Sequence, residues 1–215
     1  ARRKLAEPPI LIEDINTENI EMRMVNVLTN KGYFQAGVES EEEGEGKKID
    51  LKFTASVKTP YRIKNLYYPK PESKIDSQLL AFKKETLLRE NDVFSLDKLK
   101  EERERIDAQL KELGYFYFNP DFIVFEVDST IGDRKVDLHM AVKAETPEKG
   151  LKAYTINRIS MNPDYEIADT IDRSEFNRIR VDSITYFKKG NGMFRPKALT
   201  RLVFLKEDSL YSRKN

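Results

Sequence analysis

The sequence has no cysteine and only one histidine among its 215 residues. The absence of cysteine excludes disulfides, thiolate chemistry and zinc sites built from thiolates. A single histidine cannot form a metal site of several histidines or a catalytic pair of them. Lysine and arginine number 38 against 37 aspartate and glutamate residues. With charges so balanced, binding of nucleic acid or anionic lipid would need a local patch.

Long apolar segments are also missing from the sequence. The longest apolar runs, such as residues 122–125, are far shorter than the ~20 residues that span a bilayer. Residues 1–9 lack the apolar core of a signal peptide, and the sequence does not begin with methionine. The sequence is therefore expected to be a soluble piece of a longer protein, without a membrane span.

Large aromatic side chains and charges are abundant in the chain. It has 12 Phe and 10 Tyr, too many large apolar side chains for a disordered chain. Charged residues make up 35% and hydrophobic residues 39%. This composition is typical of small modules, whose surface is large relative to their core.

An internal repeat is the main organising feature of the sequence. One pattern occurs twice: an amphipathic helix that ends at Gly-Tyr-Phe, followed by two alternating strands. The first helix is predicted over residues 18–30, with Asn16 as a cap. The second is predicted over residues 95–113, with Ser95 as a cap and Leu99, Ile106, Leu110 and Leu113 on one face. Gly32 and Gly114 can adopt the left-handed conformation that ends a helix. Two helices with the same exit signal indicate two copies of one module.

Each Gly-Tyr-Phe leads into a predicted hairpin. The first hairpin is predicted to have strands over residues 33–39 and 49–58, joined by an acidic turn over residues 41–48. The second has strands over residues 116–127 and 136–142. Apolar and polar residues alternate in the later strand of each hairpin, which is typical of a strand with one buried and one solvated face.

Each hairpin is followed by a further strand that begins Tyr-x-Ile, at Tyr61 and at Tyr154. A helix over residues 76–89 completes a middle unit of strand, helix, helix and hairpin. The third copy is expected to have its first helix over residues 197–203 and an insertion near residues 164–190. The first copy lacks its opening strand and helix, so both end copies are expected to be incomplete.

The order of these elements resembles the POTRA domain, a β-α-α-β-β module that occurs in tandem. The resemblance rests on Glu-Pro-Pro at residues 7–9, Lys-Gly-Tyr-Phe at 31–34, Pro-Tyr-Arg-Ile at 60–63, and the helix that leads to Gly-Tyr-Phe at 114–116. It is most similar to the periplasmic region of outer-membrane β-barrel assembly factors of the BamA/TamA type. The insertion in the third copy departs from the family pattern.

The resemblance implies an α+β fold of tandem modules, each a three-stranded sheet covered on one face by two helices. Residues 1–59 would be the C-terminal part of a first module and residues 60–148 a complete second module. Residues 149–215 would be the N-terminal part of a third module, with the insertion near 164–190.

The resemblance also implies a role. It indicates a non-enzymatic scaffold at the periplasmic face of the bacterial outer membrane, in an assembly or translocation factor whose chain continues into a membrane β-barrel. Such modules bind unfolded outer-membrane protein clients and periplasmic accessory proteins, and an extended peptide can pair with an exposed sheet edge. In the family the first hairpin strand lies at that edge, which here gives these candidate partner-binding residues: Tyr33, Phe34, Gln35, Ala36, Val38, Phe116, Phe118, Phe122 and Val124.

Other interpretations were weighed against this one. No cofactor or metal site is expected, because His139 alternates onto a solvated face and the acidic run 39–45 lacks the spacing of a calcium loop. Residues 39–43 of this run would instead protect the first edge from aggregation. The Gly-Tyr-Phe signal is either structural or places one ring beside a bound peptide. The alternative function is a tandem nucleic-acid-binding array, which the balanced charge and the acidic hairpin disfavour.

Overall fold

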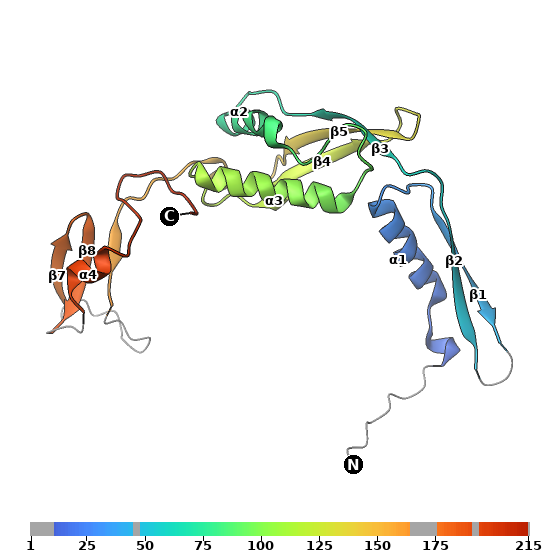
Figure 1. The fold of residues 1–215 in the computed structure, drawn as a ribbon, viewed down its shortest axis with the longest axis horizontal. Helices are drawn as coiled ribbons and strands as arrows, with labels where there is room; N and C mark the ends of the chain where they lie inside the picture. Colours follow the sequence, from blue (N-terminus) through green and yellow to red (C-terminus); the bar gives the residue numbers. More distant parts are fainter. Residues whose placement is uncertain (1–10, 45–47, 164–175, 191–193, 215) are drawn as a thin grey trace, which may run out of the picture. The chain divides into compact units, whose positions relative to one another are not determined.

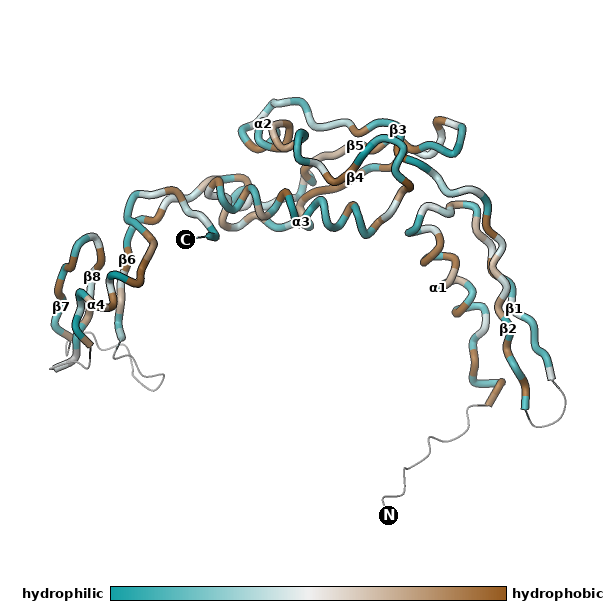
Figure 2. The backbone as a smooth tube through the Cα atoms, viewed as in Figure 1, coloured by the Kyte–Doolittle hydropathy of each residue, from teal (hydrophilic) through white to brown (hydrophobic). Residues whose placement is uncertain are grey.

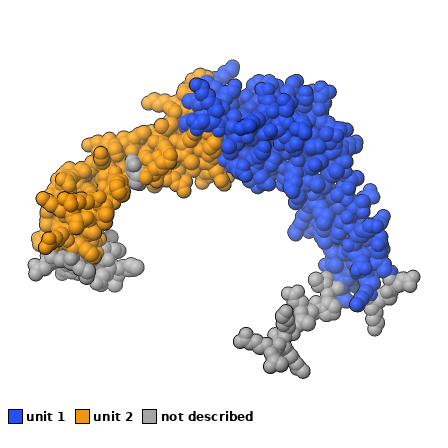
Figure 3. Space-filling model, in the orientation of Figure 1, with its two compact units in different colours: residues 1–70, 80–102, 124–141 blue, residues 71–79, 103–123, 142–215 orange. Residues whose placement is uncertain are grey.

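The computed structural model describes residues 11–44, 48–163, 176–190 and 194–214 (Figure 1). The chain divides into two compact units, which Figure 3 colours separately: residues 1–70, 80–102 and 124–141, and residues 71–79, 103–123 and 142–215. No helix in the described part of the chain is long and apolar enough to cross a bilayer.

The first unit begins with a helix and a hairpin. A short 3₁₀ turn, η1 (Ile12–Asp14), precedes α1 (Thr17–Asn30), which lies beside the antiparallel strands β1 (Gly37–Glu43) and β2 (Asp50–Ser56) (Figure 1). The side chain of Asn16 accepts a hydrogen bond from the amide of Asn19 at 2.8 Å, which confirms the predicted cap. The acidic turn predicted over residues 41–48 is wrong at its start, because β1 continues to Glu43.

The complete module in the middle of the chain contains a three-stranded sheet. Its strands are β3 (Arg62–Tyr67), β4 (Ile123–Asp128) and β5 (Lys135–Val142), in the order β3-β5-β4, with β3 parallel to β5. Val136, Leu138 and Met140 alternate along β5 and are buried, as predicted. His139 is exposed on the other face, where its ring stacks on Tyr67.

The helices of this module are α2 (Lys74–Ala81), the 3₁₀ turn η2 (Phe82–Glu85) and α3 (Leu96–Glu112). Figure 2 shows α3 as mainly hydrophilic, and its Leu99, Ile106 and Leu110 form the buried row that the sequence predicts. The helix predicted over residues 76–89 is present but wrong at its end, because the helical backbone stops before Thr86, whose ψ is 141°. The element order β3-α2-α3-β4-β5 nevertheless gives the predicted β-α-α-β-β module.

The second unit ends in another small sheet, after the 3₁₀ turn η4 (Glu148–Leu151). Strands β6 (Ile159–Met161), β7 (Phe176–Val181) and β8 (Ile184–Lys189) lie in the order β6-β8-β7, with β6 parallel to β8. The helix α4 (Pro196–Thr200) follows, and is shorter than the predicted helix over residues 197–203.

The hairpin β7–β8 lies within residues 164–190, where the sequence predicts an insertion, and residues 164–175 lie outside the described part of the chain. Residues 7–9, which contributed to the family resemblance, also lie outside it. β6 begins at Ile159, later than the strand predicted from Tyr154. Residues 154–156 are instead held by backbone hydrogen bonds to residues 208–211.

Candidate functional site

Free strand edges are the surfaces on which the expected peptide binding depends. β5 is central in the middle sheet, so β4 has one edge that pairs with no strand among the described residues. β1 pairs only with β2 in the same part of the chain. A free edge presents backbone N–H and C=O groups that an extended peptide can pair with.

The edge strand β4 has a buried row and a solvated row. Ile123 and Phe125 are buried, whereas Glu126 on the alternate row is exposed. Val127 lies on the same face as Ile123 and Phe125 but is 39% exposed. This face of β4 is therefore buried along most of the strand and open to solvent near its end. Asp128 follows, and hydrogen bonds from the side chain and amide of Thr130 lower its pKa.

The edge strand β1 is strongly acidic. Val38 is buried, while the side chains of Glu39, Glu41, Glu42 and Glu43 are exposed. Charges along an edge hinder uncontrolled pairing of sheets. The glutamates lie on the edge strand itself, where the protective role expected for them requires them to be.

The predicted partner-binding residues do not all lie on these edges. Val38 lies on β1 and Val124 on β4, and these are the two that the structure places on a strand. The strands predicted to start at residues 33 and 116 are wrong at their starts. The residues that lie before the strands are Tyr33, Phe34, Gln35, Ala36, Phe116, Phe118 and Phe122.

Helix-ending turns explain this difference. The amides of Tyr33 and Tyr115 donate to the carbonyls of Leu28 and Leu110, at 3.0 and 3.1 Å. The chain then makes a further turn in each copy, in which the amide of residue 36 or 118 donates to the carbonyl of the tyrosine. Phe118 is only 2% exposed, so this side chain is part of the core.

The first Gly-Tyr-Phe joins the first copy to the middle module. The carbonyl of Gly32 accepts a hydrogen bond from the amide of Tyr61 at 2.8 Å, and the carbonyl of Tyr61 accepts one from Phe94 at 2.9 Å. The ring of Phe34 stacks on Tyr61 with centroids 4.7 Å apart and meets Phe94 edge-on at 5.0 Å. This set of contacts is called the first joint below.

The second Gly-Tyr-Phe makes the same backbone contacts with the segment that follows the second hairpin. The carbonyl of Gly114 accepts from Tyr154 at 2.8 Å, and the carbonyl of Tyr154 accepts from Tyr211 at 2.9 Å. Phe116 meets Tyr211 edge-on, with centroids 4.8 Å apart. Gly-Tyr-Phe therefore has a structural role at both positions, and these contacts form the second joint.

The role of the two glycines in close packing could not be read from their helix-ending position alone. A Cβ at Gly32 would lie 2.8 Å from the carbonyl oxygen of Phe94, and one at Gly114 would lie 2.7 Å from Cδ1 of Leu210. The sequence did hold one signal of this packing, the Tyr-x-Ile that recurs after each hairpin. The carbonyl oxygen of this tyrosine lies close to the glycine in both copies.

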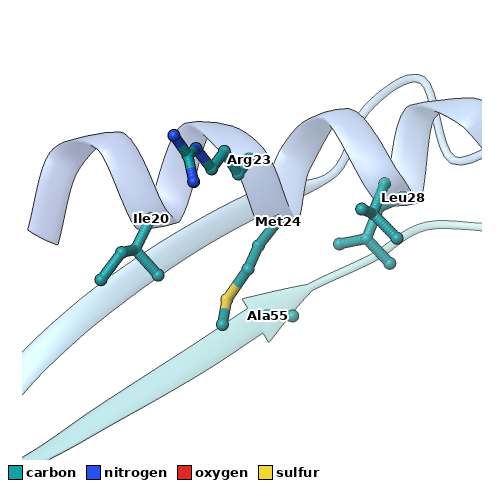
Figure 4. Close-up of a pocket in the computed structure, with 6 residues that line it drawn as sticks. Ile20, Arg23, Met24, Leu28 and Ala55 are labelled. Atoms are coloured by element: carbon teal, nitrogen blue, oxygen red, sulfur yellow. The ribbon is translucent and has the colours of Figure 1, made fainter.

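An open apolar hollow lies between α1 and β2. It has a volume of about 490 Å³ and is lined mainly by Ile20, Met24, Val27, Leu28 and Ala55. Figure 4 shows Met24 extending from the helix toward Ala55 on the strand. The equivalent helix, α3, has a fully buried apolar row. β2 also lacks, among the described residues, the parallel partner that β3 provides to β5.

Charged side chains do not form a metal centre in the part of the chain that the structure describes. No group of three or more His, Cys, Asp or Glu side chains there could hold an ion. Of the buried carboxylates, Asp107 pairs with Lys111 at 2.9 Å, and Glu102 accepts a hydrogen bond from the amide of Leu87 at 2.9 Å.

Comparison with known families gives one match. Residues 72–144 match the POTRA family, described as "Surface antigen variable number repeat". These residues hold α2, α3, β4 and β5 of the middle module. No curated protein sequence matches the chain.

The chain is also similar to solved structures. These include BamA from Haemophilus ducreyi lacking POTRA domains 1–3, at 16% identity and a TM-score of 0.40, over 60% of this chain and 23% of that one. POTRA3–5 of BamA from Haemophilus influenzae match at 14% identity and a TM-score of 0.42, over 92% and 64%. POTRA1–3 of the periplasmic domain of Omp85 from Anabaena match at 13% and 0.29, over 92% and 66%. The chain spans less than two thirds of the length of each structure.

Proposed function

We propose that the chain, whose residues 72–144 match the POTRA family, is part of the periplasmic region of an outer-membrane protein assembly or translocation factor. In this proposal the chain has no catalytic activity. Its modules bind unfolded outer-membrane protein segments and periplasmic accessory proteins, and the binding surface is the free edge of a small sheet.

The observation that supports this function is the free edge of β4 in the POTRA domain. Backbone pairing provides affinity without reading the side chains of the added peptide. One edge could therefore serve many client sequences, as an assembly factor requires. β1 offers a second edge of the same kind.

The binding surface proposed here is β1 and β4 themselves, and not residues 33–36 and 116–122, which precede these strands. The proposed pairing groups are the backbone atoms of β1 and β4, and Val38 and Val124 are the predicted residues that belong to them. Phe34 and Phe116 belong to the joints, so their proposed contribution is to the structure around the edges.

A titration of the isotope-labelled 215-residue chain with an extended, β-prone peptide from an outer-membrane barrel strand tests the proposal by NMR. Amide shifts are expected to concentrate on β4 and β1. The matched control peptide has proline at alternate positions, which removes backbone donors, and should cause no such shifts. Shifts spread over the helices, or none at millimolar peptide, would count against strand addition.

The nucleic-acid alternative is tested by a filter-binding series with single-stranded RNA and DNA at rising salt. Four exposed glutamates on β1 oppose a polyanion, so no specific retention is expected. Retention that falls steeply with salt would instead support the alternative, because counterion release causes that dependence.

A further inference from the structure

A small apolar cavity opens beside the free-edge strand of the POTRA domain. It has a volume of about 280 Å³ and its apolar lining comes from Phe34, Phe94, Leu96 and Val127. Thr29, Asn30 and Ser129 contribute polar groups to the lining. This cavity, called the notch below, exceeds the roughly 150 Å³ that accommodates a benzene ring in a protein core.

The notch lies where the buried row of β4 ends. Ile123 and Phe125 are covered, but Val127 is 39% exposed and lines the notch. Side chains alternate between the faces of a strand, and a residue directly opposite on an added strand has its Cβ about 4.5–5.5 Å away on the same face. The residue opposite Val127 would therefore be the one beside the notch.

The opposite face of β4 carries negative charge at the neighbouring positions. Glu126 is exposed and has no ion pair within the described ranges. Asp128 is held by two hydrogen bonds from Thr130, at 2.8 and 2.6 Å, that favour its ionised form. Residues opposite these two carboxylates would be on the solvated face, where cross-strand pairs of opposite charge are favourable.

From this geometry we infer that β4 selects among added strands by one bulky apolar side chain that enters the notch, with Lys or Arg on each side of it in the sequence. The inference rests on the proposed strand addition and adds a preference to it. Backbone pairing holds the peptide, and the notch and the two carboxylates set its register.

The probe is the heptapeptide Thr-Val-Lys-Phe-Lys-Val-Thr, whose palindromic order gives the same pattern in either strand direction. Its Phe would lie opposite Val127, and its two Lys residues opposite Glu126 and Asp128. The comparison peptide has Thr in place of Phe, which retains a strand-forming side chain but removes the ring. The expected loss is about tenfold in affinity for the 215-residue chain, measured from amide shifts of β4.

Two variants locate the effect. Ser129→Trp fills the notch from an exposed position and should reduce the affinity of the Phe peptide to that of the Thr peptide, while leaving the Thr peptide unchanged. Val127→Asp should weaken the Phe peptide despite adding an attraction for its lysines. Val57→Asp is the matched control, because Val57 is also an exposed valine but does not line the notch, and it should have no effect.

The outcomes separate the inference from the function on which it rests. Equal affinities of the Phe and Thr peptides, with both shifting β4, would overturn selection by the notch and leave strand addition standing. If neither peptide shifts β4, strand addition at this edge is wrong and the inference fails with it. A Phe preference that survives in Ser129→Trp would place the ring elsewhere and also overturn the inference.

Discussion

The carbonyl oxygen of Gly32 accepts a hydrogen bond from the amide of Tyr61 at 2.8 Å. Gly32, two residues after the end of α1, is thereby bound to the residue that precedes β3, 29 positions further along the chain. Gly32 has a φ of +91°, so it also needs the left-handed conformation that glycine adopts without strain. Gly32 must therefore both adopt a left-handed backbone conformation and leave room for the backbone of the next module, which a Cβ would meet at 2.8 Å.

Gly32→Ala is expected to lower the free energy of unfolding by more than the cost of the backbone conformation alone. Gly132 is the matched control, because its φ is +82° and a Cβ there would meet nothing within 4 Å. Gly132→Ala should cost about 1–2 kcal/mol for the left-handed conformation. Gly32→Ala should cost about 1–3 kcal/mol more, since the new methyl group meets a backbone oxygen. Chemical denaturation followed by circular dichroism measures both, and equal losses would show that the close contact has no energetic role.

Glu102 is fully buried and accepts a hydrogen bond from the amide of Leu87. Glu102→Ala is expected to lower the free energy of unfolding by about 1–3 kcal/mol, because a buried amide then loses a partner. Glu102→Gln keeps an acceptor oxygen and should lose less. The control is Glu101→Ala at the exposed neighbouring position, where denaturation should show a change within about 0.5 kcal/mol. Similar losses at the two positions would contradict this account of Glu102.

Lys111 pairs with the buried Asp107 and also donates to the carbonyl of Phe118 at 3.1 Å. Lys111→Ala is expected to cost about 3 kcal/mol, because it leaves a buried carboxylate without its cation. Lys152→Ala breaks the exposed pair with Glu148, also spaced i, i+4, and should leave the denaturation midpoint unchanged. Comparable shifts of the midpoint in both variants would contradict the importance of burial.

Asp128 has a lowered pKa, caused first by the hydrogen bond from the Thr130 side chain and then by the one from its amide. A carboxyl group with a lowered folded-state pKa stabilises the fold above its unfolded pKa, and that contribution is lost as the pH falls through the folded pKa. Thr130→Ala should therefore raise the pKa of Asp128 and reduce the stability that the ionised carboxylate contributes. A carbon-detected NMR titration measures the pKa. Ser129→Ala leaves both hydrogen bonds intact and should not change it, and an unchanged value in Thr130→Ala would rule out the side-chain bond as the main cause.

Local patterns in the sequence predicted α1, α3 and the central strand β5 well. The caps at Asn16 and Ser95 bond to the amides of Asn19 and Lys98, and the spacing of Leu99, Ile106 and Leu110 marked the buried side of α3. These features depend on residues within one or two turns of each other, so sequence spacing is enough to find them.

Features that depend on distant residues were missed. Tyr33 and Phe34 have strong strand propensity, but their backbone belongs to the turn that closes α1, and Phe34 packs on Tyr61 and Phe94. The hairpin β7–β8 was placed within an insertion, yet its parallel pairing with β6 could not be foreseen, because the sequence between them carries no register signal. Tertiary contacts decided both cases.

The two joints have one consequence for how such chains can diversify. The hydrogen bonds from the amides of Tyr61 and Phe94 in the first joint, and of Tyr154 and Tyr211 in the second, run between main-chain atoms. Substitutions elsewhere in a copy leave these bonds untouched, so a duplicated copy can acquire new surface chemistry, or a hairpin such as β7–β8, without losing its attachment to its neighbour.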